Sequence, residues 1–155
     1  MSATRPVLEV DNLKAHYVTR LGARIQAVAG VTFALKEGEI LGIAGESGCG
    51  KTTLVSACMG MCIPPLYRTS GDVRIDGASI FEIGREQHRK DVLGRRIAMI
   101  PQGALNSLNP TRKVGDLAAD MITSHEDGGD RKGIQARLRD RFTRIGLDAE
   151  RVLDA

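Results

Sequence analysis

The chain has 155 residues, of which 42% are hydrophobic, 26% charged and 3% aromatic. This length allows one domain and hardly more, and the composition excludes collagen-like, coiled-coil and strongly disordered chains. A formal net charge of +3 and few aromatic side chains do not indicate a nucleic-acid-binding protein.

The sequence contains no recognisable segment for export or membrane insertion. The first residues lack the basic and then apolar regions of a secretory signal. The uncharged stretch 52–67 is shorter than a bilayer span and contains Pro64 and Pro65. The three cysteines fit no common zinc pattern and are expected to be reduced thiols. We therefore expect a soluble, cytoplasmic chain.

The first elements in chain order predict an antiparallel pair of strands. Apolar residues between Val7 and Val18 predict the first strand, Leu21-Gly22-Ala23 a turn, and residues 25–35 the second strand. The continuous apolar run 39–44 predicts a further strand, buried on both faces as in a parallel sheet.

A glycine-rich loop follows this third predicted strand directly. It reads Gly45-Glu46-Ser47-Gly48-Cys49-Gly50-Lys51-Thr52-Thr53 and matches the phosphate-loop pattern G-x-x-x-x-G-K-[ST]. Glycines permit left-handed dihedrals that turn backbone N–H groups inward around an anion, and a helix N-terminus adds positive potential. Lys51 would contact the β- and γ-phosphates, and the Thr52 hydroxyl would ligate Mg²⁺. The loop therefore predicts binding of a nucleoside triphosphate with Mg²⁺.

The middle of the chain predicts a helix and two more strand regions. Apolar positions at helical spacing over 54–62 predict a helix that Pro64 and Pro65 end. Alternating residues over 71–80 with the Asp76-Gly77 dipeptide predict a hairpin, and residues 97–101 predict a short buried strand leading into Gln102. The charged stretch 85–96 between them is predicted as a solvated helix or loop.

The last third predicts helices. Residues 114–122 and 134–145 have apolar side chains at helical spacing, separated by the polar break 125–130. Gly146 is a stop signal and Asp148 a candidate N-cap for another helix. The arginines of the second helix are interpreted as a solvated face rather than a surface for nucleic acid or membrane.

The phosphate loop alone does not name the nucleotide. No N-K-x-D motif occurs, and the two D-x-x-G tetrapeptides, which begin at Asp91 and Asp130, follow polar rather than strand-like residues. We do not interpret the chain as a GTPase, because a pattern with two defined positions is weak evidence.

Three patches of sequence resemble the ATP-binding subunits of ABC transporters, and more narrowly those of dipeptide, oligopeptide and nickel importers. The patches read LEVDNLKAHY, AVAGVTFALKEGEILGIAGESGCGKTT and IAMIPQGALNSLNPTRKVGDL. The triplet Leu108-Asn109-Pro110 in the third patch is typical of the peptide-importer branch. The resemblance extends over nearly the whole chain.

The resemblance implies an α/β fold of the P-loop NTPase class. It would combine an antiparallel front β-region (about 1–38) with part of a parallel core sheet and flanking helices. Within that core, 39–62 would hold a strand, the Walker A phosphate loop and a helix, and 71–102 the strands up to the Q-loop. Residues 103–155 would hold the Q-loop and the start of a helical subdomain.

The same resemblance implies roles for individual residues. Tyr17 would stack on adenine, residues 45–53 would bind ATP, and Gln102 would ligate Mg²⁺ and sense the γ-phosphate or the attacking water. Without the resemblance, a tyrosine in a front strand is as often a packing residue as a ligand-binding one, and a lone glutamine after a strand indicates no special role. Residues 103–110 would meet an integral membrane permease subunit. A second ATP-binding subunit would complete the assembly on the inner face of the membrane.

Several motifs of the resembled family do not occur in the chain. We find no L-S-G-G-Q-type signature and no apolar strand ending in an Asp-Glu pair, and none of His16, His88 and His125 suits the switch position. The chain is therefore expected to be an N-terminal portion that binds Mg-nucleotide weakly and does not hydrolyse it alone. Two alternatives stay open: another phosphate-loop enzyme such as a small-molecule kinase, and a non-catalytic docking fragment.

Overall fold

The computed structural model describes residues 5–103, 108–124 and 131–154. The chain divides into two compact units, Met1–Ile97 and Ala98–Ala155. The first unit holds the strands and the phosphate loop, and the second consists of helices and connecting segments.

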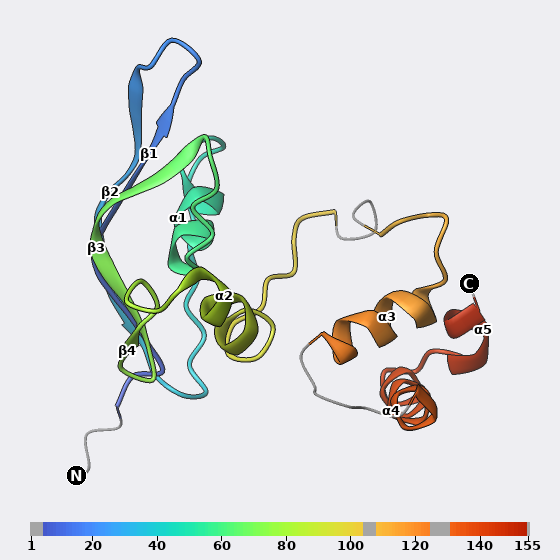
Figure 1. Cartoon of the computed structure of the whole chain (residues 1–155). Coiled ribbons are helices and arrows are strands. Elements are labelled where there is room, and N and C mark those ends of the chain that lie inside the picture. The colour runs from blue at the N-terminus through green and yellow to red at the C-terminus, as the bar shows by residue number, and fades with distance from the viewer. Residues whose placement is uncertain (1–4, 104–107, 125–130, 155) are drawn as a thin grey trace. The chain divides into compact units, whose positions relative to one another are not determined.

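The first unit is built on an antiparallel sheet with the strand order β2-β1-β3-β4. Its strands are β1 (Leu8–Val18), β2 (Arg24–Leu35), β3 (Leu66–Ile75) and the short β4 (Ala78–Ser79). The helix α1 (Lys51–Cys58) lies against β1 and β2 (Figure 1). The predicted front sheet is confirmed, with β3 beginning at Leu66 rather than near residue 71.

A bulge in β1 explains an irregularity in its apolar pattern. The buried residues are Val10 before the bulge and Leu13 and Ala15 after it, so the inward-facing positions change from even to odd numbers. The pairing of β1 is interrupted between Val10 and Leu13 on the β2 side and between Asp11 and Lys14 on the β3 side, around Asn12, whose φ is 45°. Because side chains alternate between faces along a strand, the extra residue keeps both apolar sets on the core side.

The neighbouring strands carry a glycine at the level of this bulge. Gly71 of β3 has a φ of 88°, and a Cβ there would lie 2.3 Å from the carbonyl oxygen of Asn12. Gly30 of β2 has a φ of 89°, and its Cβ would lie 2.8 Å from Asn12 Oδ1. At Gly71 only a residue without a side chain allows the backbones of β1 and β3 to approach this closely, whereas at Gly30 the contact is with the Asn12 side chain and the positive φ favours glycine.

The predicted turn at Asp76-Gly77 is confirmed. Asp76 and Gly77 have φ values of 50° and 78°, and they join Ile75 to Ala78, which are paired across β3 and β4. Two successive positive φ values are those of a type I′ turn, whose twist matches that of the flanking strands.

The core of the first unit lies between the sheet and α1. The largest fully buried side chains are Leu13, Val10 and Val73, which come from β1 and β3. The buried part of α1 contributes Ala57 and Cys58, and Ile80 and Val92 close the core at the end of the sheet. Burial of these apolar side chains stabilises the unit by about 25 cal/mol per Å² of surface removed from water.

Two segments predicted as strands of a parallel sheet do not form strands in the described structure. The segment 39–44 has no regular secondary structure, and Ile40 is 95% exposed. The segment 97–101 contains one residue in a β-bridge, Ile97 with Leu93, and Ile100 is 91% exposed. An apolar run becomes a strand only where a neighbouring backbone pairs with it, and no described strand pairs with either segment. The prediction of strands at these two segments is therefore wrong for this structure.

The helical predictions for the first unit are confirmed with changed boundaries. The helix after the phosphate loop ends at Cys58, before the predicted end near residue 62. The charged stretch forms α2 (Arg85–Gln87), which continues as the π-helical turn η1 (His88–Val92). The backbone N–H of Leu93 donates to the carbonyl of His88 at the end of this turn.

The second unit contains the predicted helices. They are α3 (Val114–Thr123), α4 (Arg131–Arg144) and α5 (Ala149–Asp154). Gly146, with a φ of 78°, follows the end of α4, and Asp148 caps α5 by accepting a hydrogen bond from the backbone N–H of Arg151 at 3.2 Å. Two arginines on α4 form ion pairs, Arg139 with Glu150 and Arg144 with Asp140, as expected of a solvated face. Within the described ranges, no helix is both long and apolar enough to cross a bilayer.

Candidate functional site

The phosphate loop connects the segment 39–44 to α1 and bends at its glycines. Gly48 and Gly50 have φ values of 82° and 97°, in the left-handed region that other residues rarely adopt. A Cβ on Gly50 would lie 2.6 Å from the carbonyl oxygen of Ala27 in β2. Gly50 is therefore required both for the turn and for the close approach of the loop to the sheet.

The helix after the loop begins with unpaired donors. Gly50 is the N-cap residue, no side chain among the described residues caps the helix, and the first turn holds no acidic residue. The backbone N–H of Leu54 donates to the carbonyl of Gly50 at 2.8 Å. The N–H groups of Lys51, Thr52 and Thr53 precede the first intrahelical bond, so they lack acceptors in the helix. Together with the helix dipole, they make this end of α1 attractive to an anion.

The side chain of Lys51 folds back over the loop. Its Nζ donates to the carbonyl oxygens of Gly45 at 2.7 Å and Glu46 at 2.6 Å, and it lies 3.5 Å from the Sγ of Cys49. These contacts hold the ammonium group directly above the loop. The backbone N–H of Cys49 also donates to the carbonyl of Glu46, at 3.3 Å. The arrangement concentrates positive charge where the loop curves.

The two threonines that begin α1 have different surroundings. Thr52 is exposed and its hydroxyl has no hydrogen-bond partner within the described part of the chain. Thr53 is buried, and its Oγ1 lies 3.0 Å from the hydroxyl of Tyr17 in β1. A free hydroxyl oxygen is a suitable ligand for Mg²⁺, which prefers oxygen donors. Thr52 therefore fits a metal ligand, whereas Thr53 links the helix to the sheet.

Tyr17 has the packing role that the sequence left open beside adenine stacking, together with a hydrogen bond that the sequence did not indicate. The ring is half-buried and packs against the core of the first unit, and its hydroxyl is bonded to Thr53. The predicted stacking of Tyr17 on adenine stays a prediction. The contact between strand and helix had no signal in the sequence, because nothing in a strand pattern identifies the partner of one hydroxyl.

The remaining predicted site residues lie in different places. Glu46, Ser47, Gly48 and Cys49 are exposed on the loop, beside the residues already described. Gln102 is exposed in a turn of the second unit, and its predicted role as a metal ligand stays a prediction. The predicted permease contact, residues 103–110, falls partly outside the description, because residues 104–107 are among those not described.

A groove of about 330 Å³ runs beside the phosphate loop. Its walls are mostly apolar and come from β2, the segment before the loop and α1. They include Ala27, Val31, Ile43, Ala44 and Leu54, with Lys51 at one side. Sequence reasoning did not identify β2 as a wall of the site. Ala27 lies close to Gly50 of the phosphate loop, but a small apolar residue in a strand gives no sign of such a contact in the sequence.

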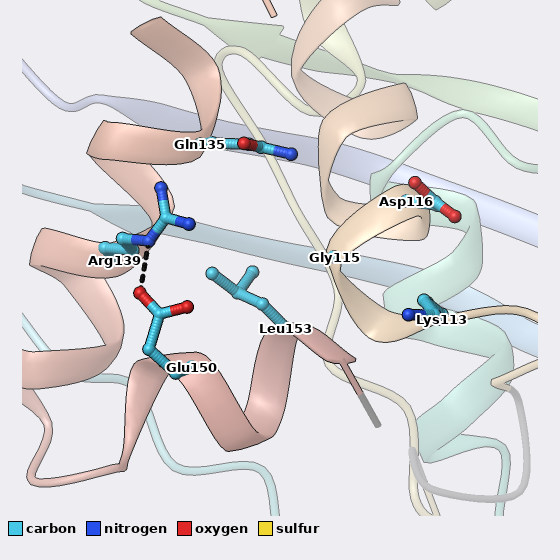
Figure 2. A pocket seen from close by; sticks show the side chains of 7 residues that line it. All are labelled: Lys113, Gly115, Asp116, Gln135, Arg139, Glu150 and Leu153. Carbon is cyan, nitrogen blue, oxygen red and sulfur yellow. Dashed lines mark hydrogen bonds and ion pairs between the residues drawn. The ribbon is translucent and has the colours of Figure 1, made fainter. Parts of the chain in front are cut away.

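The second unit has a polar pocket of about 350 Å³ between its three helices. Figure 2 shows the side chains around it, including Lys113, Asp116 and Gln135. Arg139 on α4 donates from Nε to Oε1 of Glu150 on α5 at 2.6 Å across this pocket (Figure 2). The charged groups that line the pocket are of both signs, so it lacks the single-sign charge of the phosphate loop.

Comparison with known proteins gives consistent matches. A family model described as "ABC transporter" matches residues 28–154. The chain is 38% identical to the oligopeptide transport ATP-binding protein OppD of Bacillus subtilis (strain 168) over 121 residues, which are 77% of this chain and 33% of that protein.

Two further relatives match more of the chain. Identity is 35% to the oligopeptide transport ATP-binding protein OppF of Bacillus subtilis (strain 168), covering 95% of this chain and 46% of the relative. Identity is 31% to the dipeptide transport ATP-binding protein DppD of Lactococcus lactis subsp. cremoris (strain MG1363), covering 96% of this chain and 42% of the relative. The chain thus spans between a third and a half of the length of these relatives.

Proposed function

The chain belongs to the ABC transporter family, and on this premise we propose that it supplies the ATP-phosphate clamp of an ATP-binding subunit in a peptide importer. The relatives named as oligopeptide and dipeptide transport ATP-binding proteins support the peptide class. The full-length subunit would couple binding and hydrolysis of ATP to uptake of the solute. The alternative of a small-molecule kinase has no support from these relatives.

The position of the Lys51 ammonium carries the proposal. It is held by the carbonyls of Gly45 and Glu46 at the uncapped start of α1. An ammonium has three donors, and an anionic phosphate oxygen is a stronger acceptor than a neutral carbonyl. ATP phosphates would therefore replace carbonyl contacts of Lys51 while accepting from the free N–H groups of the helix.

We propose that Mg²⁺ accompanies ATP at this site. The exposed hydroxyl of Thr52 would ligate the ion. The resemblance to the family implies the same role for the amide oxygen of Gln102. When bound, Mg²⁺ neutralises charge that develops on the phosphates during phosphoryl transfer. Tyr17 would contribute by stacking on the base, and its half-buried ring is already held by Thr53.

Partners are proposed from the same premise. The Q-loop region, residues 103–110, would contact an integral membrane permease subunit, and a second ATP-binding subunit would face the phosphate loop. The protein would then be cytoplasmic and peripheral on the inner face of the membrane. The present chain alone would bind Mg-nucleotide weakly without hydrolysing it, because it supplies the clamp and only part of the metal site.

Calorimetric titration of the chain with Mg-ATP tests the proposal. Lys51→Ala should weaken binding about tenfold to a hundredfold, since a hydrogen bond to a charged group contributes roughly 1.5 to 3 kcal/mol. Lys90→Ala is the matched control, because Lys90 is an exposed lysine paired with Glu86 at 3.1 Å. Equal affinity in the wild type and Lys51→Ala would overturn the phosphate clamp. Phosphate release by the isolated chain above that of Lys51→Ala would contradict the proposed lack of hydrolysis.

A further inference from the structure

The first unit contains a cavity that the phosphate loop does not use. Its volume is about 560 Å³, within the range of pockets that hold small organic molecules. One wall is the segment after α1, residues 60–64. The other wall is formed by residues between Ile80 and Leu93, which include α2 and part of η1.

A buried histidine nitrogen lies at the wall of this cavity. His88 is 9% exposed, and its Nε2 has no hydrogen-bond partner among the described residues. A Cβ on Gly60 would lie 2.8 Å from this nitrogen and 3.2 Å from Cδ1 of Ile80, and both Gly60 and Ile80 line the cavity. Buried polar atoms are nearly always hydrogen-bonded, so an unpaired imidazole nitrogen at a cavity wall points to a polar ligand atom.

Two arginines line the same cavity. Arg85 and Arg89 lie three residues before and one residue after His88, on the turns of α2 and η1. Neither side chain forms a hydrogen bond or an ion pair within the described part of the chain. The nearby acidic residue Glu86 is instead paired with Lys90. The charged side chains that line this cavity are therefore both cationic, and guanidinium groups bind carboxylates through paired N–H donors.

The remainder of the lining is mostly apolar. Ile63, Ile80, Ile83 and Leu93 contribute hydrocarbon surface. Burial raises the pKa of the Cys62 thiol, which also lines the cavity and so stays uncharged at neutral pH. An anion without an apolar part would leave this hydrocarbon surface uncovered. The lining therefore favours a ligand that has both an anionic group and an apolar part.

We propose that this cavity binds a monocarboxylate with a hydrocarbon chain, such as a medium-chain fatty acid. The carboxylate accepts hydrogen bonds from Arg85 and Arg89, and from His88 Nε2 after a small rotation of the imidazole. The hydrocarbon chain packs against the isoleucine side chains. This site is separate from the phosphate loop and does not depend on the proposed ATP binding.

Titration of the whole 155-residue chain with octanoate tests the site. Calorimetry should show saturable binding of octanoate, and much weaker binding of octanol, acetate and inorganic phosphate, because each of these lacks either the charge or the hydrocarbon chain. Heteronuclear NMR should show the imidazole signals of His88 shifting with octanoate. No binding of octanoate, or equal binding of inorganic phosphate, would overturn the proposal.

Matched substitutions locate the ligand. The double variant Arg85→Gln, Arg89→Gln should weaken octanoate binding at least tenfold, whereas Lys90→Gln, on the same turn but away from the cavity lining, should leave it unchanged. His88→Leu should also weaken octanoate binding and leave octanol binding unchanged. Both arginines are exposed, so the double variant keeps the test valid if His88→Leu fails to fold. Equal affinity in the double variant and Lys90→Gln would overturn the assignment.

Discussion

The front sheet and the segment that leads into the phosphate loop are both rich in apolar residues but differ in structure. In the sheet, β1 is paired on both sides and Leu13 is completely buried. The segment 39–44 has a more continuous apolar run, yet it pairs with no described strand and Ile40 is almost fully exposed. Apolar content is thus similar, and the presence of a paired neighbour makes the difference.

The two regions also differ in what they contribute. The sheet supplies burial, which stabilises the first unit, while the exposed segment and the loop after it supply donors and a cation for an anionic ligand. Residues of the same type in the two regions should therefore respond differently to the same substitution. Three matched pairs of substitutions test this difference. In each pair, one residue is packed against the sheet or α1 and the other lies exposed on segment 39–44 or on the phosphate loop.

The largest difference is expected between two truncations of apolar side chains. Leu13→Ala should lower the free energy of unfolding by about 2 to 5 kcal/mol, because it leaves a cavity in a fully buried site. Ile40→Ala should change it by less than about 0.5 kcal/mol. Urea unfolding followed by circular dichroism measures both. Equal losses for the two variants would show that segment 39–44 is packed like the sheet.

The second pair concerns glycines. Gly50→Ala should cost about 1 to 3 kcal/mol, because Gly50 has a φ of 97° and a Cβ there would meet the carbonyl of Ala27. Gly42→Ala should stabilise slightly or have no effect, since Gly42 has no positive φ and a Cβ there would meet no atom within 4 Å. Thermal unfolding of the two variants measures the difference. A Gly50→Ala variant as stable as Gly42→Ala would contradict the close contact between loop and β2.

The third and smallest difference is expected between cysteines, and only at alkaline pH. Burial, with a smaller contribution from nearby Cys62, raises the pKa of Cys58 from 9.0 to about 11. As the pH rises, the thiol ionises in the unfolded chain before it ionises in the folded chain. The contribution of the neutral Cys58 thiol to the free energy of unfolding is therefore complete below about pH 9 and is lost as the pH rises toward 11. Cys58→Ala should therefore reduce the alkaline loss of stability.

Cys49→Ala is the control for this pH dependence, because Cys49 is an exposed thiol on the loop. Urea unfolding measured at several pH values from about 8 to 11 covers the titration of Cys58 in the unfolded and the folded chain. Over this range the wild type and Cys49→Ala should lose stability in parallel. An unchanged alkaline profile in Cys58→Ala would contradict the effect of burial on this thiol.

Local signals in the sequence predicted much of the fold. The Asp76-Gly77 turn, the helix stop at Gly146 and the N-cap at Asp148 depend on neighbouring residues alone, and the structure has all three. The phosphate loop was likewise identified from a local pattern, the spacing of its glycines and Lys51. Periodicity also located the helices of the second unit, because one helix face has to be apolar to pack.

Features that depend on distant residues were not predictable in this way. The contact of Tyr17 with Thr53 and the approach of Ala27 to Gly50 join positions far apart in the chain. The unpaired state of segment 39–44 likewise depends on which neighbours are present rather than on its own residues. Sequence patterns describe what a segment can bury, whereas the identity of its partner is a property of the folded chain.

The bulge at Asn12 has a consequence for strand alignment. Sliding β1 by two residues along either neighbour would keep its apolar side chains on the core side, so burial alone does not exclude that misalignment. After such a slide, the carbonyl of Asn12 would face a residue with a side chain instead of Gly71. On the opposite side Gly30 adds a weaker restraint, because its contact is with the side-chain Oδ1 of Asn12, although its φ of 89° also disfavours other residues. The bulge therefore acts as a register lock between β1 and β3.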